Sequence, residues 1–432
     1  MASEREPIAV IGTGYVGLVT AAGFAELGNE VWCVDVDADK IERLQRGEVP
    51  IYEPGLADSI TRSQGRLHFF TELAPALEHA RLLFVAVGTP PTYSGDADLS
   101  AVHAVVDAMP TSEAHALVMK STVPVGTGQS IRRALDQRGK SGFSYVSCPE
   151  FLKEGSALQD FLAPDRVVVG DVGDWAGDAV VELYSPLQAP LVRTDIASAE
   201  MIKLAANAFL ATKISFINEI ANVCEETGAD VLEVARGMGL DQRIGTHFLR
   251  PGIGFGGSCF PKDVSALKQL AGNSGYHFQL LTAVIEVNEL QKRRVIAKLQ
   301  KHLGSLVGKT VALLGLAFKA NTDDMREASS LVLAARLQAD GARVRAYDPV
   351  AEAEAQKLMH GVEFADSALD AVQGADAIVL VTEWPEFAEL DWNKVAKVTK
   401  GRIVIDGRNC VDGEVVRSTG FVYEGVGRPS LG

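Results

Sequence analysis

A glycine-rich turn between a short apolar strand and a helix limits the fold of this chain more than any other feature. Residues 8–11 are apolar, and residues 12–17 follow them with the spacing G-x-G-x-x-G. Apolar positions in residues 16–27 recur as they do in a helix, and residues 30–34 predict a second strand. A strand, a helix and a strand in this order predict two parallel strands, which begin an α/β sheet.

The three glycines of this turn predict a dinucleotide site. Gly12 permits the tight turn, Gly14 lets the backbone approach a pyrophosphate, and Gly17 lets the helix pack closely on the strand. The first helical residues, Tyr15 and Val16, bring N–H groups and the positive end of the helix dipole to the phosphates. The alternative is a purely structural turn, but the strand and helix around it are the context that the fingerprint requires.

Asp35 ends the second strand at the distance from the turn where dinucleotide sites carry an acid. Its carboxylate can accept hydrogen bonds from both ribose hydroxyls of NAD, and its charge repels the 2′-phosphate of NADP. Lys40 lies close in sequence and would favour that phosphate. Because the acid ends the strand itself, we predict NAD as the cofactor.

Two later turns also follow apolar strands, at the carboxyl ends where ligands bind in such sheets. Thr89 lies in the first turn, and Ser121 and Thr122 lie in the second. Their hydroxyl groups can contact the ribose or the nicotinamide, and they can equally cap a helix.

The composition is that of an ordinary globular protein of two or three domains. The chain has 432 residues, of which 47% are hydrophobic and 22% are charged. A net charge of -15 disfavours nonspecific binding to nucleic acid or to an anionic membrane, so a phosphate ligand needs a local group of Lys and Arg. Five cysteines without framework spacing, no signal peptide and no long apolar run indicate a cytoplasmic protein in a reducing compartment.

The order of elements predicts three parts. Further apolar runs up to residue 169 extend a doubly wound sheet, and from about Ser198 a long helical pattern runs to Thr227. Helical stretches at residues 264–270 and 280–303 follow, and strand-helix alternation resumes at Gly308. We expect an α/β protein with two Rossmann-like doubly wound domains, joined by a long central helix and a helical middle domain. The expected boundaries are 1–197, 198–305 and 306–432, with a loose tail from about Gly425.

Cys259 is the candidate nucleophile. It lies in the run GIGFGGSCFPKD, behind Gly256 and Gly257 and ahead of Lys262 and Asp263. Glycines allow a substrate close to the backbone, and a nearby cation favours the reactive thiolate. The four other cysteines lack this setting: Cys33 and Cys224 lie in apolar stretches and are expected in the core, while Cys148 and Cys410 are left open.

Two pairs of polar residues spaced by four are further candidates. If a helix begins at Glu150, it shares one helical face with Glu154, and one carboxylate facing a cleft could activate water. The alternative is a solvated acidic face. Lys203 and Asn207 project from an otherwise apolar side of the long helix, where they need partners or serve to stabilise an oxyanion. A snorkelling lysine is the alternative there.

Seven sequence blocks together resemble the UDP-glucose/GDP-mannose dehydrogenase family, in the family's order and over nearly the whole chain. They are GTGYVG (12–17), GTPPT (88–92), STVPVG (121–126), PEFLKEG (149–155), the Lys203/Asn207 helix, GFGGSCFPKD (254–263) and FKANTDDMREA (318–328). The cysteine block is the most specific of them. The last block is most similar to the members that oxidise UDP-glucose. The turn Glu53-Pro54-Gly55-Leu56 is also shared, without an evident mechanism.

The resemblance implies oxidation of a sugar C6 alcohol to a carboxylate, with two NAD and one water consumed and no metal. Cys259 would attack the intermediate aldehyde to give a thiohemiacetal and then a thioester, with Glu150 as general base. The implied catalytic residues are Cys259, Glu150, Lys203, Asn207, Asp263 and Thr122. The implied cofactor contacts are Glu154, Lys262 and Arg326, beside Gly12, Gly14, Tyr15, Val16, Gly17, Asp35, Lys40, Thr89 and Ser121.

The resemblance also implies a nucleotide-sugar site and a homodimer formed through the long helix. The implied substrate contacts are Phe151, Leu152, Lys153, Arg243, Arg250, Gly256, Lys319 and Arg408, with Arg243 reaching the partner subunit's substrate. The expected substrate is UDP-glucose. Alternatives are GDP-mannose or an N-acetylated UDP-hexosamine, a two-electron hydroxy-acid dehydrogenase that needs no thiol, and a catalytically silent NAD-binding protein.

Overall fold

A computed structural model describes residues 5–109, 115–140 and 142–429 of the chain. The chain forms two compact units. Unit 1 comprises residues 1–206 and 265–276, and unit 2 comprises residues 207–264 and 277–432. In the described part of the chain, no helix is both long enough and apolar enough to cross a membrane.

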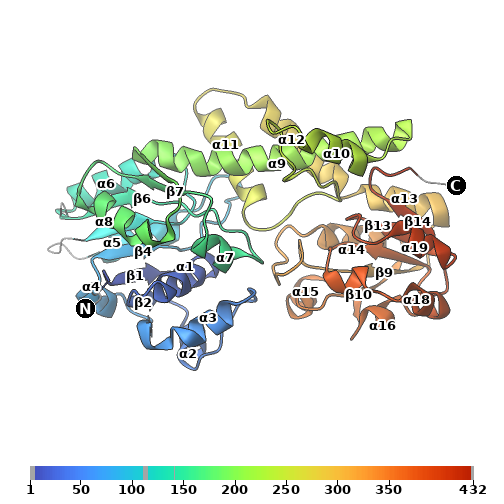
Figure 1. Ribbon diagram of the computed structural model, residues 1–432, viewed down its shortest axis with the longest axis horizontal. Helices are drawn as coiled ribbons and strands as arrows, with labels where there is room; N and C mark the ends of the chain where they lie inside the picture. Colours follow the sequence, from blue (N-terminus) through green and yellow to red (C-terminus); the bar gives the residue numbers. More distant parts are fainter. Residues whose placement is uncertain (1–4, 110–114, 141, 430–432) are drawn as a thin grey trace. The chain divides into compact units, whose positions relative to one another are not determined.

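Unit 1 is built on a sheet with the strand order β3-β2-β1-β4-β5-β6-β7-β8 (Figure 1). All neighbouring strands pair in parallel except β6 and β7, which meet antiparallel at Ser147 and Gly170. The strands are β1 (Ile8–Ile11), β2 (Val31–Val34), β3 (Leu67–Phe70), β4 (Leu82–Val85), β5 (Ala116–Met119), β6 (Ser144–Ser147), β7 (Val167–Gly170) and β8 (Leu191–Thr194).

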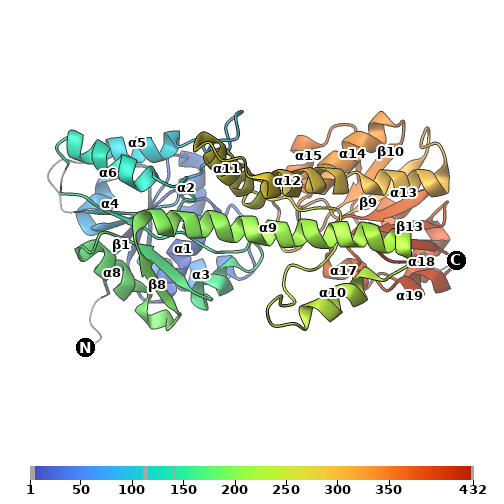
Figure 2. The ribbon, with the colours of Figure 1, turned by 90° about the horizontal axis from the view of Figure 1, so that it is seen from above.

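Helices cover both faces of this sheet, because its strands are apolar on both sides. Ile8 and Val10 face one core, which is closed by α1, α2, α3, α7 and α8, and Ala9 and Ile11 face another, closed by α4, α5 and α6. Figure 2 shows α5 and α6 on one side and α1 and α8 on the other. The helices are α1 (Tyr15–Glu26), α2 (Ala38–Gln45), α3 (Leu56–Arg62), α4 (Ala74–His79), α5 (Ser100–Ala108), α6 (Thr127–Gln137), α7 (Ala157–Leu162) and α8 (Trp175–Tyr184).

Unit 2 contains a second sheet, in which every neighbouring pair is parallel and the order is β11-β10-β9-β12-β13-β14. Val311 and Leu313 face a core with α9 (Ile196–Thr227), α10 (Val231–Gly239), α13 (Arg294–Leu303), α14 and α15. Ala312 and Leu314 face a core with α16 to α19. The strands are β9 (Thr310–Leu314), β10 (Arg343–Tyr347), β11 (Glu363–Phe364), β12 (Ala377–Leu380), β13 (Ile403–Asp406) and β14 (Val422–Gly425). The helices are α14 (Ser329–Ala339), α15 (Glu352–Leu358), α16 (Ala368–Val372), α17 (Pro385–Ala388), α18 (Trp392–Val398) and α19 (Gly413–Ser418).

Both sheets have the doubly wound order in which the chain reverses direction between a first and a fourth strand. In unit 1 the reversal lies between β1 and β4, and in unit 2 it lies between β9 and β12. Ligands bind at the carboxyl ends of the strands beside such a reversal. The predicted fold class, two Rossmann-like domains with a helical middle region, is confirmed.

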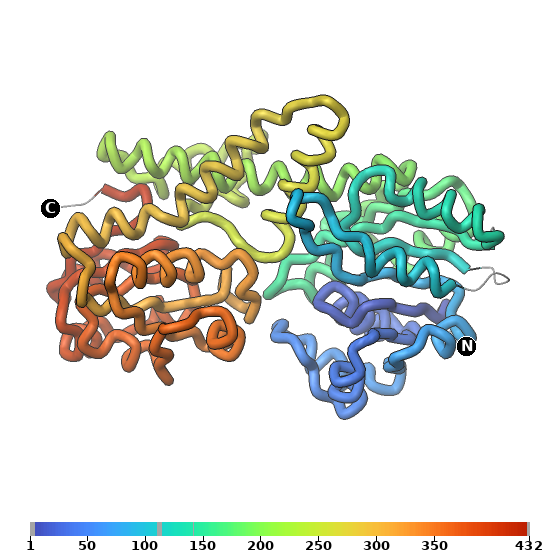
Figure 3. The backbone as a smooth tube through the Cα atoms, turned by 180° about the vertical axis from the view of Figure 1, so that it is seen from behind, coloured from blue at the N-terminus to red at the C-terminus, as the bar shows by residue number. Residues whose placement is uncertain are grey.

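The helical region consists of α9 (Ile196–Thr227), α10 (Val231–Gly239), α11 (Phe260–Asn273), α12 (Gln279–Gln291) and α13 (Arg294–Leu303). The prediction of one helix over residues 280–303 is wrong, because a turn at Lys292 and Arg293 separates α12 from α13. Figure 3 shows the chain passing directly from α12 into α13. No glycine or proline marks this turn, so its sequence carries no signal for it.

Two further expectations need correction. Residues 149–156 form an irregular segment and α7 begins at Ala157, so Glu150 and Glu154 do not share a helical face. The tail is held rather than loose as far as residue 429: β14 ends at Gly425, and the N–H of Gly427 donates to Glu225 Oε1 at 2.8 Å. Residues 430–432 of the expected tail lie outside the described residues.

We predict that Gly17→Ala destabilises unit 1. A Cβ atom at this position would lie 1.8 Å from the carbonyl oxygen of Gly12, so α1 must move away from β1. Such overpacking costs about 1–3 kcal/mol or more of unfolding free energy, measured by urea denaturation. Gly65→Ala is the control, since a Cβ there meets nothing within 4 Å. A loss below about 0.5 kcal/mol for Gly17→Ala would contradict the packing argument.

Candidate active site

The glycine turn of unit 1 has the geometry that a pyrophosphate requires. Gly12 has a φ of 94°, and a Cβ on it would lie 2.8 Å from the carbonyl oxygen of Ala86, beyond β4. A Cβ on Gly14 would meet nothing within 4 Å, so the backbone is open to a ligand there. Gly14 also precedes α1 and gives no side-chain cap to the N–H groups of its first turn, which begins with Tyr15 and Val16, and such groups can bind a phosphate. These residues fit NAD.

The side chain of Asp35 is held beside this turn by contacts within the protein. Its Oδ2 accepts hydrogen bonds from the N–H and the hydroxyl of Thr13, both at 2.8 Å, and from Lys40 Nζ at 3.1 Å. Burial raises the pKa of Asp35, but its hydrogen bonds with Asp37, Thr13 and Lys40 lower it by more, so the pKa lies below its usual value. The carboxylate is therefore ionised and oriented, and Lys40 is already paired with it.

The predicted hydroxyl residues tie the turns after β4 and β5 to each other. Thr89 Oγ1 donates to the carbonyl of Thr122 at 2.9 Å, and Ser121 Oγ donates to the carbonyl of Val87 at 2.7 Å. Neither turn caps a helix with these groups, since Leu99 precedes α5 and Gly126 precedes α6. Their proposed contacts with NAD remain predictions.

Glu150 and Lys203 form a buried ion pair in unit 1. Lys203 Nζ, from α9, lies 2.9 Å from Glu150 Oε1, and the side chains are only 3% and 5% exposed. Glu150 Oε2 accepts a hydrogen bond from the N–H of Leu152 at 2.5 Å. The snorkelling alternative for Lys203 is wrong, because its ammonium meets a carboxylate inside the protein. Removal of either partner would break this buried ion pair, which costs stability.

The other side chains of residues 149–156 differ in their exposure and in their contacts. The Phe151 ring lies under the guanidinium of Arg166, 3.5 Å from its centroid, a contact that the sequence analysis missed. Lys153 is exposed and pairs with Asp160 at 3.2 Å, so its side chain is engaged at the surface. Glu154 is half-buried in the turn before α7.

Cys259 belongs to unit 2 and directly precedes the first residue of α11, and its carbonyl accepts the N–H of Asp263 at 2.9 Å. The thiol is half-buried, and its Sγ lies 3.6 Å from Ser258 Oγ. A helix N-terminus stabilises a thiolate, which adds a second reason for reactivity to the glycines and Lys262.

The other thiols differ from Cys259. Cys33, Cys148 and Cys224 are buried, which agrees with the core expected for two of them. Burial raises the pKa of the Cys33 thiol, and burial together with Asp406 raises the pKa of Cys410. A raised pKa keeps these two thiols protonated and inert.

Asp263 collects two of the predicted residues in unit 2. Asn207 Nδ2 donates to Asp263 Oδ2 at 2.6 Å, and Lys262 Nζ lies 2.6 Å from Asp263 Oδ1. Asp263 is 1% exposed. The two oxygens of Asp263 therefore hold the amide of Asn207 and the ammonium of Lys262 near the first turn of α11, which follows Cys259.

Three buried amides hold the glycine run ahead of Cys259, and the sequence analysis missed all of them. Asn218 Oδ1 accepts the N–H of Gly252 at 2.8 Å, and Gln291 Nε2 donates to its carbonyl at 2.9 Å. Asn288 bonds both the N–H and the carbonyl of Phe255, at 2.7 and 3.0 Å. Amides that look like ordinary core positions of α9 and α12 thus shape the loop.

The glycines themselves permit a close approach to the 318–328 segment. A Cβ on Gly256 would lie 2.2 Å from the carbonyl oxygen of Glu327, and one on Gly257 would lie 2.8 Å from the Phe318 ring. The N–H of Gly257 donates to the carbonyl of Arg326 at 2.8 Å. Two blocks that lie far apart in sequence therefore form one surface in unit 2.

The predicted cations of the substrate site fall into two groups. Arg408 donates to the carbonyls of Gly254 and Val381, both at 2.9 Å, at the carboxyl ends of β12 and β13. Lys319 follows Phe318, the residue that Gly257 approaches, and its Nζ lies 5.3 Å from the centroid of the Phe318 ring. By contrast, the side chains of Arg243, Arg250 and Arg326 are exposed, with Arg243 held by Asp241 and Arg326 by Asp324.

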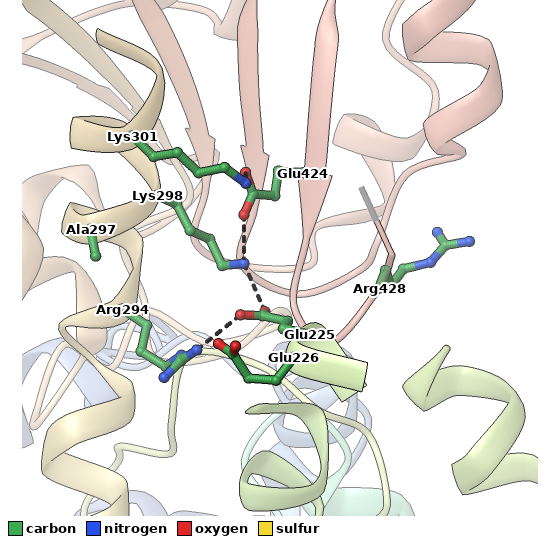
Figure 4. A pocket seen from close by; sticks show the side chains of 8 residues that line it. All are labelled: Glu225, Glu226, Arg294, Ala297, Lys298, Lys301, Glu424 and Arg428. Atoms are coloured by element: carbon green, nitrogen blue, oxygen red, sulfur yellow. Dashed lines mark hydrogen bonds and ion pairs between the residues drawn. The ribbon is translucent and has the colours of Figure 1, made fainter. Parts of the chain in front are cut away.

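A cavity of about 300 Å³ in unit 2 lies apart from these residues (Figure 4). It is lined by Glu225, Glu226, Arg294, Ala297, Lys298, Lys301, Glu424 and Arg428. Lys298 pairs with both Glu225 and Glu424, at 2.7 and 2.9 Å, and Arg294 pairs with Glu225 at 2.9 Å. These charges compensate one another and join α9, α13 and β14, so the cavity gives no sign of a second active site.

The chain matches the models of three domains of the UDP-glucose/GDP-mannose dehydrogenase family. The NAD binding domain matches residues 6–188, the central domain residues 197–290, and the UDP binding domain residues 312–413. The chain is 48% identical to UDP-glucose 6-dehydrogenase TuaD of Bacillus subtilis, covering 98% of this chain and 94% of the relative. It is 49% identical to the UDP-glucose 6-dehydrogenase of Pseudomonas aeruginosa, with 98% of both chains covered.

Solved structures of nucleotide-sugar dehydrogenases are also similar to this chain over nearly its whole length. A UDP-glucose dehydrogenase from Pyrobaculum islandicum superimposes with a TM-score of 0.92 at 38% identity, with 99% of both chains covered. A UDP-D-ManNAc dehydrogenase from Pyrococcus horikoshii gives 0.86 at 29% identity, covering 98% of this chain and 99% of that one. The chain therefore belongs to the UDP-glucose/GDP-mannose dehydrogenase family. It is an NAD-dependent oxidoreductase.

We predict that Asp35→Asn weakens the preference for NAD. The variant loses the negative charge that repels a 2′-phosphate, and Lys40 loses the nearer of its two carboxylate partners. The ratio of kcat/KM with NAD to that with NADP should fall about tenfold or more, which corresponds to about 1.4 kcal/mol. Asp39→Asn is the control, an exposed acid in the first turn of α2. An unchanged ratio in Asp35→Asn would remove Asp35 from cofactor selection.

Proposed function

We propose that the protein oxidises UDP-glucose to UDP-glucuronate in two successive two-electron steps at C6, with Cys259 as a covalent nucleophile. The observation that carries this proposal is the position of Cys259, a half-buried thiol at the start of α11 behind a glycine run held by buried amides. A dehydrogenase that stops at the aldehyde has no use for such a thiol.

The first oxidation needs a base and a group that stabilises the developing alkoxide. Glu150 is the proposed base, and its ion pair with Lys203 keeps the carboxylate oriented. Lys203, with Asn207 and Thr122, is proposed to stabilise oxyanions and to order water. NAD, when bound, accepts the hydride that leaves C6 in each of the two oxidations.

Cys259 then retains the product of the first step. Its thiolate adds to the aldehyde carbon and forms a C–S bond, and the thiohemiacetal loses a second hydride to become a thioester. Water attacks the thioester, the C–S bond breaks, and the thiolate is regenerated with the carboxylate. In total, one alcohol and one water give one carboxylate, two hydrides and three protons. The tether explains how a four-electron oxidation can proceed without release of the aldehyde.

UDP-glucose is the proposed substrate because relatives that match nearly the whole chain carry that substrate in their names. The proposed contacts are the backbone and side chains of 151–153, Gly256, Lys319 and Arg408, with Arg250 and Arg243 reaching the diphosphate from exposed positions. In the same family, GDP-mannose and N-acetylated UDP-hexosamines are the alternatives. A panel of nucleotide sugars decides between them, and no rate with UDP-glucose would exclude our choice.

A homodimer formed through α9 is also proposed. Phe209, Phe216 and Val223 recur every seven residues along the helix and are 66%, 48% and 57% exposed. A stripe of large apolar side chains at this spacing suits a second copy of the same helix. Arg243 is proposed to reach the partner subunit's substrate. The boundaries 1–197, 198–305 and 306–432 and the cytoplasmic location belong to the same proposal.

We predict that the enzyme forms two NADH for each UDP-glucose consumed, and that Cys259→Ser abolishes this stoichiometry. Without the thiol the aldehyde is not captured, so steady-state kcat falls about 100-fold or more. Absorbance at the NADH band against sugar consumed measures both. Cys410→Ser is the control, because that half-buried thiol lies outside the proposed chemistry. One NADH per sugar in the unaltered enzyme, or full uronate production by Cys259→Ser, would rule out the covalent scheme.

We predict that Phe216→Glu converts the dimer to a monomer. A carboxylate in the middle of the stripe opposes the same charge on the second copy. Light scattering after size exclusion should shift from twice the chain mass to the chain mass. Val307→Glu, at a 73% exposed position that is not part of α9, should leave the mass unchanged. A monomer in the unaltered protein, or a dimer that persists in Phe216→Glu, contradicts the proposed interface.

A further inference from the structure

The turn before α3 has a buried acid at its start. Glu53 is 5% exposed, and Gly55, with a φ of 78°, begins α3 two residues later. Both α3 and α7 pack against α1, the helix that follows the glycine turn. The side chain of Glu53 therefore lies where three segments of unit 1 meet.

Its two carboxylate oxygens accept hydrogen bonds from two of those segments. Oε1 accepts the N–H of Ala157 at 2.7 Å, and Oε2 accepts the N–H of Gly155 at 2.7 Å. The hydroxyl of Tyr15, the first residue of α1, also donates to Oε2. The N–H of Gly155 reaches the oxygen of Tyr15 as well, at 3.0 Å. These contacts bridge 102 and 140 positions of the sequence.

We propose that Glu53 is a positioning residue for the oxidation, which fixes the segment that carries Glu150 and Glu154 to the glycine turn of the cofactor site. This inference rests on the proposed function. Glu53 acts through Tyr15 on the cofactor side and through Gly155 and its neighbours on the catalytic side, and it does not touch the substrate.

The chemistry of the acceptor explains why an acid is required. Residues 149–156 have no helix or strand to satisfy their backbone groups, so their order depends on side-chain acceptors. A carboxylate is acceptor-only and bonds three donors at once, and such charge-assisted bonds are the strong ones. A glutamine has one acceptor oxygen, and its NH₂ group would face a backbone N–H. The isosteric Glu53→Gln change therefore keeps the volume and removes the function.

The alternative is that Glu53 merely caps α7, because Ala157 is the first residue of that helix and Ser156 gives no side-chain cap. A cap changes stability alone, since it has no connection with the cofactor turn. The contact with Tyr15 distinguishes the two explanations. If Glu53 positions the segment relative to the turn, its loss must lower kcat in protein that is still folded.

The kinetic experiment compares Glu53→Gln, Tyr15→Phe and the control Glu72→Gln, an exposed acid of the same unit. We expect kcat of Glu53→Gln to fall about 10- to 100-fold, as for a displacement near 1 Å, with KM for UDP-glucose changed less than about threefold. Tyr15→Phe keeps both bonds from the backbone to Glu53 and should lose less. The double variant should be no slower than Glu53→Gln alone, because both changes act on one oxygen. Additive losses, or a folded Glu53→Gln with unchanged kcat, overturn the proposal.

Hydrogen exchange tests the same contact without catalysis. Peptides that contain Gly155 and Ala157 should exchange about tenfold faster in Glu53→Gln, while peptides of β1 keep their protection and report an intact fold. Unchanged exchange at Gly155 overturns the inference even if activity is lost. If the unaltered protein fails to oxidise UDP-glucose while Glu53→Gln still exchanges faster than it at Gly155 and Ala157, the proposed substrate is wrong and the contact of Glu53 stands. If Glu53→Gln does not fold, Tyr15→Phe decides, and an unchanged kcat there overturns the proposal.

Discussion

Both units depend on buried acceptors that satisfy the backbone N–H groups of irregular loops at the ends of parallel strands. A loop at such a place loses contact with water, and an unpaired N–H there costs as much as a lost hydrogen bond. Glu200 accepts the N–H groups of Gly126 and Gly128 after β5. Asp348 accepts those of Leu316 and Ala317 after β9, and Glu53 serves the segment after β6. Carboxylates thus satisfy the backbone N–H groups of the loops, as strand pairing satisfies those of the sheets.

The same requirement gives the cysteine loop its form. A run of glycines has little structure of its own, and ordering it costs more entropy than ordering other residues. The amides of Asn218, Asn288 and Gln291 offset this cost, because each holds the loop with a donor or an acceptor that fits only one backbone position. The close passage of Gly256 against Glu327 then adds a steric limit. The loop ahead of Cys259 is thus held in place, as the proposed nucleophile requires, and glycine flexibility alone would not provide this.

The sequence predicted those features whose cause lies within about twenty residues, the span of a strand-helix-strand unit. The glycine turn and Asp35 belong to one such unit, so their spacing and the strand and helix around them were enough to predict them. The need of Lys203 for a partner also followed from its apolar surroundings, but the identity of Glu150 did not, because 53 positions separate them. Asn288 carried no signal at all, since a buried amide in a helix looks like any polar residue. Exposed arginines such as Arg243 came from the family resemblance, and their side chains bond acids beside them.

Helix α9 is the element in which these constraints converge. Lys203 and Asn207 are one turn apart on it, yet each is paired with a carboxylate of its own unit, Glu150 in unit 1 and Asp263 in unit 2. A buried lysine and a buried amide on one helix would be costly if either lost its acid. The helix therefore cannot change its rotation relative to either partner without breaking a charged contact.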